Sequence, residues 1–313
     1  MSRDHQELDL SLMAGVTDRG LRHRQNEDAM ELAVVPAADG PVLVAVVCDG
    51  VSTSTRPQDA SLAAAQAAAR VLRSAAEAGT DLSEASAEAV RSAVEAVSGL
   101  ADSPGEVGSA TFISAAGTAA GVTLCWLGDS RAYWLAAEPA DAQRLTRDDS
   151  LAQEMVSLGL LPEDEALDSP QAHVVTRWVG ANPAEAQPHV ERFEPPGAGV
   201  LLLCSDGLWN YQPEAAGLAG LAMPAAQTDP LGSARTLVKF AIEAGGRDNI
   251  TAVLIPFPPG TPAEPGPEPA AQPAGRDHQD TQPHIPPFAR GAEPSETGAE
   301  PPEPGAEPPG PGA

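Results

Sequence analysis

Four acidic segments lie far apart in this chain, and each stands beside an apolar run that is typical of a β-strand. They are 26–28 (Asn-Glu-Asp), 48–50 (Cys-Asp-Gly), 205–207 (Ser-Asp-Gly) and 248–249 (Asp-Asn). A carboxylate at the end of a buried strand is costly unless a positive group meets it. Because the pattern recurs, the sequence predicts that these acids share one positive partner. Oxygen donors of this kind suit Mg²⁺ or Mn²⁺ better than Zn²⁺.

Any one of these segments alone is equally well explained by an Asp that caps a helix or makes a turn. The metal interpretation therefore depends on all of them together. If Glu27, Asp49, Asp206 and Asp248 converge, they can hold two cations roughly 3.5–4 Å apart, which acidify water and neutralise a phosphoryl group during its transfer. No Ser-His-acid or Cys-His arrangement offers a convincing alternative chemistry.

The composition limits the partners that the chain can have. The net charge of -26 and the sequence pI of 4.4 argue against nucleic acid or an anionic membrane surface as a partner. They do not exclude a phosphorylated substrate, because bound cations would invert the local field. Cys48, Cys125 and Cys204 lie in apolar runs without CxxC spacing, which predicts reduced core residues. With neither a spanning apolar run nor a signal-peptide core, we expect a cytoplasmic protein, and a monomer by default.

The composition also divides the chain. Residues 1–257 are rich in Ala, Val and Leu and can bury a core as one domain, whereas 258–313 consist almost entirely of Pro, Gly, Ala and Glu. Such a segment cannot bury enough apolar surface to offset its ordering entropy, which predicts a disordered acidic tail.

The apolar pattern of the first part predicts strands grouped around helix pairs. This favours an α+β fold with antiparallel sheets over alternating βα units. A capping box at Asp81 and Glu84 begins the second helix of an antiparallel pair. A hairpin is expected to turn at 117–118, with the strand 131–136 continuing its meander. The predicted strands are 10–16, 30–35, 41–48, 109–116, 120–127, 131–136, 174–175, 189–193, 200–204 and 250–255, and the predicted helices are 59–78, 84–100, 150–158, 213–223 and 231–244.

A set of short segments, in this order, resembles the metal-dependent type 2C (PPM-type) serine/threonine protein phosphatases of bacteria. The resemblance covers residues 10–255. It implies a four-layer αββα sandwich of two antiparallel sheets flanked by helix pairs, with a binuclear Mn²⁺ or Mg²⁺ centre at one end. The segments that carry it are 17–20, 26–28, 47–50, 108–111, 127–131, 145–148, 175–177 with Gly180, 203–208 and 246–251.

The resemblance also assigns ligands to the two metal ions. Asp49 would bridge both ions, and its neighbour Gly50 would lend a backbone carbonyl. Asp206 and Asp248 would complete the shell of one ion, and Glu27 would bind the other.

Two further acids take supporting roles by the same resemblance. Asp28 would hold metal-bound water as a catalytic residue outside the ligand set. Asp129 would help Asp206 to bind a third, weaker ion. Asn210 stands where many family members have an Asp, and an amide is a poorer ligand, so this third site is weakened.

The phosphate-binding position departs from the family pattern. His23 occupies the place where family members usually carry an Arg, four residues before the Glu. A histidine can still donate a hydrogen bond but lacks the permanent charge and bidentate fork of Arg. Arg22 and Arg24 flank it and are candidate substrate-binding residues, although a surface-charge role is about as plausible for both. The loop 51–57 (Val-Ser-Thr-Ser-Thr-Arg-Pro) replaces a Gly-rich segment of the family.

The function that this resemblance implies is hydrolysis of phosphoserine and phosphothreonine in proteins, opposing a Ser/Thr kinase. The segment 162–171 corresponds to the variable flap of the family. Its acids Glu163, Asp164 and Glu165 predict a preference for neutral or basic sequence around the phosphosite. Two alternatives stay open: a catalytically silent relative that binds phosphoproteins, and a specialised phosphatase of an anti-sigma-factor antagonist.

Overall fold

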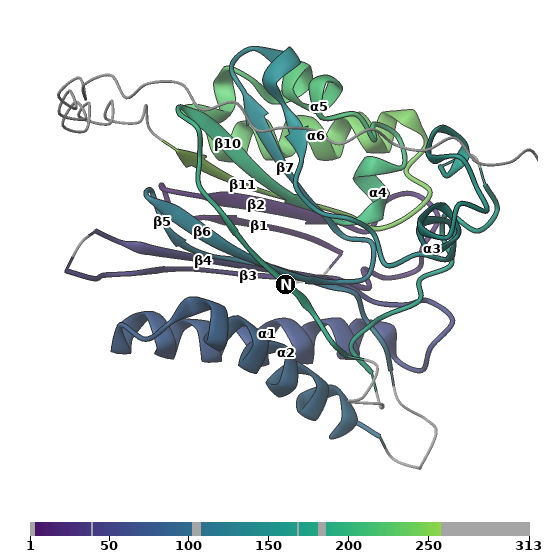
Figure 1. Cartoon of the computed structure of the whole chain (residues 1–313), viewed down its shortest axis with the longest axis horizontal. Coiled ribbons are helices and arrows are strands. Elements are labelled where there is room, and N and C mark those ends of the chain that lie inside the picture. The colour runs from purple at the N-terminus through teal and green to yellow at the C-terminus, as the bar shows by residue number, and fades with distance from the viewer. Residues whose placement is uncertain (1–3, 39, 102–107, 168, 181–185, 258–313) are drawn as a thin grey trace, which may run out of the picture. The chain divides into compact units, whose positions relative to one another are not determined.

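The computed structural model describes residues 4–38, 40–101, 108–167, 169–180 and 186–257. Two antiparallel sheets lie face to face, and helices cover the outer face of each (Figure 1). The predicted α+β fold with four layers is confirmed. The predicted tail, 258–313, lies outside the described residues, so the division of the chain at residue 257 stays a prediction.

The first sheet is covered by a pair of Ala-rich helices. Ala60, Ala64 and Ala68 of the first helix are fully buried in one cluster with Val44 and Val46 of the sheet, because small side chains let the helix lie close to it. The strand order is β3 (Asp28–Val35), β4 (Val42–Asp49), β5 (Phe112–Thr118), β6 (Gly121–Leu127) and β9 (His189–Phe193), and the helices are α1 (Pro57–Ala78) and α2 (Leu82–Ser98). Asp81 caps α2 by accepting hydrogen bonds from the N–H groups of Ser83 and Glu84, as the sequence predicted.

The second sheet has the last strand of the domain near its middle. Its order is β1 (His5–Asp9), β2 (Ala14–Asp18), β11 (Ile250–Phe257), β10 (Gly199–Cys204), β7 (Arg131–Ala136) and β8 (Gln143–Arg144). The helices α5 (Ala215–Ala222) and α6 (Pro230–Ala244) bury Leu218 and Leu237 against its outer face. No described helix has both the length and the apolar content needed to cross a bilayer.

A third apolar layer fills the space between the sheets. Ala45 and Val47 of β4 meet Leu203 of β10 and Val253 of β11 there. Since Val44 and Val46 face the helices, β4 is buried on both faces, which explains why its sequence is continuously apolar.

The predicted strand at 10–16 is only partly correct. Residues 14–16 lie in β2, whereas residues 10–13 form the turn of the hairpin that joins β1 to β2. Ser11 adopts a left-handed backbone with φ of 65°, and its N–H donates to Oδ1 of Asp9 at 2.9 Å. The Leu residues of this turn are partly exposed, so their apolar pattern does not report a core strand.

The chain after β6 also departs from the prediction. The strand at 131–136 does not continue the meander, because the chain crosses at 128–130 to the other sheet as β7. The hairpin before it turns at 119–120 rather than 117–118. At 174–175 there is only an isolated bridge between Val175 and Ser150.

Several short elements complete the domain. The predicted helix at 150–158 is confirmed as α3 (Leu151–Ser157), whereas the single turn α4 (Asp206–Trp209) was not predicted. Among the described residues, the 3₁₀ turns η1 (Pro139–Asp141), η2 (Glu163–Glu165) and η3 (Ala225–Gln227) lie in the connections.

Candidate metal centre

The four acidic segments meet at one end of the two sheets. Asp28 begins β3 and is paired with Asp49, which ends β4. The other two segments flank β10 and β11, which are neighbours in the second sheet. The hydroxyls of Ser205 and Thr251 donate to Oδ2 of Asp28 at 2.8 and 2.6 Å, which joins the two sheets at this end.

Asn249 ties the segment that carries Glu27 to the start of β11. Its side-chain oxygen accepts a hydrogen bond from the Glu27 N–H at 2.8 Å. Its amide group donates to the carbonyls of Arg19 at 2.8 Å and Gln25 at 3.2 Å. Glu27 and Asp248 are therefore held on adjoining segments although they are far apart in sequence.

The converging carboxylates repel one another. Burial raises the pKa of Asp49 well above its usual range, and repulsion from the carboxylates of Asp28 and Asp206 raises it further. The pKa of Asp206 is also raised well above its usual range by burial, followed by repulsion from Asp129 and Asp248. These acids behave as one electrostatic cluster.

Two other acids of the cluster have smaller shifts. Burial raises the pKa of Asp28 to about 6, against the lowering effect of the Thr251 and Ser205 hydroxyls. Burial and repulsion from Asp148 raise the pKa of Asp129 to about 7. Each carboxylate is thus costly to keep ionised in the absence of a cation.

The donor set fits hard divalent cations. Oδ1 of Asp28 and Oδ1 of Asp206 are buried and have no hydrogen-bond partner within the described part of the chain, and all the clustered donors are carboxylate oxygens. In the same part of the chain, no three His, Cys, Asp or Glu side chains are grouped as the ligands of a single ion. The acids share one end of the fold without forming a closed ligand shell, and their individual metal roles stay predictions.

Two glycines allow the segments to approach closely. A Cβ on Gly50 would lie 2.6 Å from the Pro57 carbonyl oxygen and 2.8 Å from that of Glu27. A Cβ on Gly207 would lie 1.9 Å from the Asn249 carbonyl oxygen. Both positions exclude a side chain because neighbouring backbone occupies the space.

His23 lies between two predicted ligands. Its Nε2 is 3.2 Å from Oδ1 of Asp248, and its Nδ1 is 3.8 Å from Oε2 of Glu27. Arg22 and Arg24 are exposed beside it. Together with His23 and Glu27, they line a hollow of about 430 Å³. Asp248 does not line this hollow. The predicted phosphate-binding residues therefore lie at the edge of the acidic cluster.

A second hollow, of about 370 Å³, adjoins the cluster on the side of β10 and contains residues that the sequence did not single out. It is lined by His173, Asp206, Gly207, Asn210, Tyr211, Arg247 and Asp248. Asn210 donates to Oδ2 of Asp206 at 3.1 Å, so it contacts the acid as an amide donor. Arg247 lies in a segment that carried the family resemblance, but an arginine at that position did not by itself indicate a site residue. Nothing in the sequence around His173 indicated that it lies at the site.

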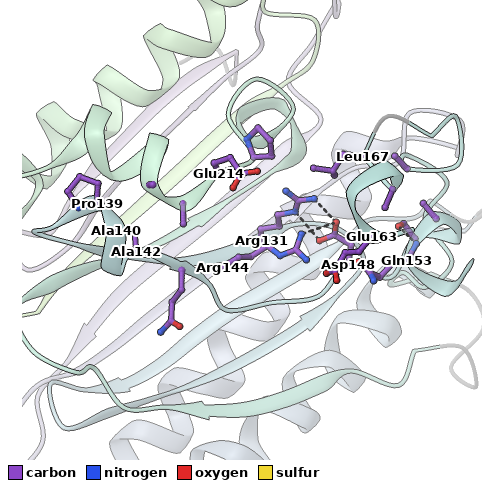
Figure 2. Close-up of a pocket in the computed structure, with 18 residues that line it drawn as sticks. Arg131, Pro139, Ala140, Ala142, Arg144, Asp148, Gln153, Glu163, Leu167 and Glu214 are labelled. Carbon is purple, nitrogen blue, oxygen red and sulfur yellow. Dashed lines mark hydrogen bonds and ion pairs between the residues drawn. The ribbon is translucent and has the colours of Figure 1, made fainter. Parts of the chain in front are cut away.

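A separate cavity of about 410 Å³ lies beside the flap and contains none of the predicted site residues (Figure 2). Arg131 and Asp148 face each other there, with Nε to Oδ1 at 3.0 Å and Nη2 to Oδ2 at 2.7 Å. The Arg131 guanidinium also donates to the Tyr133 hydroxyl at 3.1 Å and lies 3.6 Å above the Trp209 ring. This buried charge is fully matched.

Comparison with known proteins identifies the family. The family model described as protein phosphatase 2C matches residues 19–229, about two thirds of the chain. The chain belongs to the protein phosphatase 2C family.

Among curated proteins, the serine/threonine phosphatase Stp of Listeria innocua is 32% identical over 154 residues, which are 46% of this chain and 55% of Stp. The protein phosphatase PhpP of Streptococcus pneumoniae is 35% identical over 132 residues, 41% of this chain and 50% of PhpP. The chain thus spans about half the length of these relatives.

Solved structures match over a larger share. The PPM Ser-Thr phosphatase MsPP of Mycobacterium smegmatis, in complex with cacodylate, is 30% identical, with a TM-score of 0.59, over 78% of this chain and 97% of MsPP. The catalytic domain of PstP, solved with two manganese ions, has a TM-score of 0.57 over 77% of this chain and 96% of that domain. Because the two sequences are only 24% identical, this match shows a shared fold and no more.

Proposed function

We propose that this chain is a metal-dependent protein serine/threonine phosphatase with a binuclear Mn²⁺ or Mg²⁺ centre and a weaker site for a third ion. The observation that carries the proposal is the meeting of acids from both sheets, with two buried carboxylate oxygens left without partners. Membership of the protein phosphatase 2C family and the two manganese ions of the PstP domain support it.

In this proposal the acids hold the ions. Asp49, with the Gly50 carbonyl, would contribute to holding both ions, Glu27 would contribute to holding one of them, and Asp206 and Asp248 would contribute to holding the other. When bound, such ions acidify water and neutralise the charge of a phosphoryl group. Asp129 would help Asp206 to hold a third ion.

The remaining residues act on substrate and water. Asp28 accepts a hydrogen bond from water at the centre through Oδ1, since Ser205 and Thr251 occupy its Oδ2. His23 orients the substrate phosphate by a hydrogen bond, and the guanidinium groups of Arg22 and Arg24 attract its charge at the rim. The substrates are phosphoserine and phosphothreonine proteins, whose phosphates a Ser/Thr kinase supplies.

The cysteines support a cytoplasmic location. Cys48, Cys125 and Cys204 are free and buried. Free thiols suit a reducing compartment. We also propose that residues 1–257 form the catalytic domain and that 258–313 are dispensable for catalysis.

The test is hydrolysis of a phosphothreonine peptide with and without Mn²⁺, for the wild type and for Asp206→Asn. We expect Mn²⁺-dependent turnover that falls at least about 100-fold in the variant, because a lost ligand removes transition-state charge stabilisation. Asp141→Asn, at an exposed position in η1 outside the predicted site, is the matched control and should keep its turnover. No turnover by folded, Mn²⁺-loaded wild type would instead favour a binding-only relative.

A further inference from the structure

The loop that follows Gly50 is fixed on both sides of Ser52. The Val51 N–H donates to the Ser109 carbonyl at 2.9 Å. The Ser54 N–H donates back to the Val51 carbonyl at 2.8 Å, and the Ser54 hydroxyl accepts the Ser109 N–H at 3.0 Å. The direction in which the Ser52 side chain leaves the loop is therefore set by backbone contacts.

This loop delivers the Ser52 hydroxyl to a predicted metal ligand. The hydroxyl donates to Oε2 of Glu27 at 2.5 Å, which is the length of a charge-assisted hydrogen bond. The Gly50 N–H donates to the Glu27 carbonyl at 3.1 Å, so the backbone and side chain of Glu27 are both held by one short segment. Glu27 is mostly buried, with 12% of its side chain exposed, whereas Ser52 is exposed.

We propose that Ser52 is a positioning residue for Glu27 that fixes the carboxylate for metal binding. The inference rests on the proposed function and adds to it a residue outside the predicted ligand and substrate set. By occupying one lone pair of Oε2, Ser52 restricts rotation of the carboxylate and leaves Oε1 available to an ion. Hydrogen-bond partners of metal-ligating carboxylates typically change metal affinity by about 10–100-fold.

The test is the dissociation constant of Mn²⁺, measured by isothermal titration calorimetry on the full chain without substrate. We expect Ser52→Ala to weaken Mn²⁺ binding by about 10-fold, and Ser52→Thr to restore it because the hydroxyl is kept. Thr53→Ala is the matched control, since Thr53 is exposed on the same loop and its side chain makes no hydrogen bond within the described part of the chain. In a Glu27→Gln background, Ser52→Ala should have no further effect, because the charged acceptor is gone.

The outcomes separate this inference from the proposed function. Equal Mn²⁺ affinities for the wild type and Ser52→Ala would overturn the inference alone. An equal loss in the Glu27→Gln background would overturn it as well, since Ser52 would then act through another group. Failure of the folded wild type to bind Mn²⁺ would overturn both. Thermal melting of the metal-free variants should be unchanged, and a lower melting temperature for Ser52→Ala with unchanged Mn²⁺ affinity would indicate a purely structural residue.

Discussion

Two groups of buried charge lie at the same end of the second sheet and are built in opposite ways. At Arg131 the guanidinium has a bidentate partner in Asp148, a hydroxyl from Tyr133 and the ring of Trp209. In the acidic cluster, burial raises the pKa values of Asp49 and Asp206, and the neighbouring carboxylates raise them further. A fully matched charge specifies a packing arrangement, whereas an unmatched set of like charges indicates a cation from outside the chain.

The comparison predicts its largest effect at the matched pair. Asp148→Asn leaves the Arg131 guanidinium buried without a countercharge, and we expect it to lower the free energy of unfolding by about 3–5 kcal/mol. Urea denaturation measures this loss. Glu88→Gln, which removes the exposed partner of Arg91, is the control and should cost less than about 1 kcal/mol. A loss no larger than the control's would mean that the pair contributes little.

The same chemical change should have the opposite sign in the acidic cluster. Asp49→Asn removes a carboxyl that the metal-free fold must either keep charged among other acids or protonate, so we expect an increase in stability on the order of 1 kcal/mol at pH 8. Urea denaturation in the presence of a chelator measures it. Added Mn²⁺ should then stabilise the wild type more than the variant. Destabilisation of the metal-free variant would contradict the view that the cluster is unmatched.

The smallest effect concerns a matched pair at the surface. Arg235 lowers the pKa of Glu7 to about 2, below its ordinary value. The pair therefore contributes stability above the ordinary pKa of Glu7, and this contribution is lost as the pH falls towards 2. Arg235→Gln should cause a small loss of stability at pH 6 and a still smaller loss at pH 2, measured by urea denaturation at both pH values. A cost independent of pH would assign the effect to packing.

The sequence predicted the fold class and the acids of the cluster because both depend on local patterns. Apolar runs gave β3, β4 and β10, and the carboxylate at each strand end was visible without a structure. The crossing of the chain between the sheets before β7 was not predictable, because an apolar strand fits either sheet equally well. The hairpin at the N-terminus was missed because the Leu residues of its turn imitate a strand.

The supporting contacts of the site were beyond sequence reasoning for another reason. The contact between Ser52 and Glu27 depends on a loop whose path is set by Ser109, which is remote in sequence. Serine is common in loops, so residue type alone carries no signal for this role. The ion pair between Arg131 and Asp148 was missed for a similar reason. It depends on how β7 is aligned with the segment that follows β8, which the sequence alone does not reveal.

The place of β11 in its sheet bears on how the protein is made. It is the last strand of the domain to leave the ribosome, yet it lies between β2 and β10. Until it emerges, β2 lacks its inner neighbour and Asp28 lacks the hydroxyl of Thr251, a contact that spans 223 residues. Contacts of such long sequence separation form late and slow folding. A nascent chain that stops short of this strand would present two open strand edges, which makes it a natural target for chaperones and proteases.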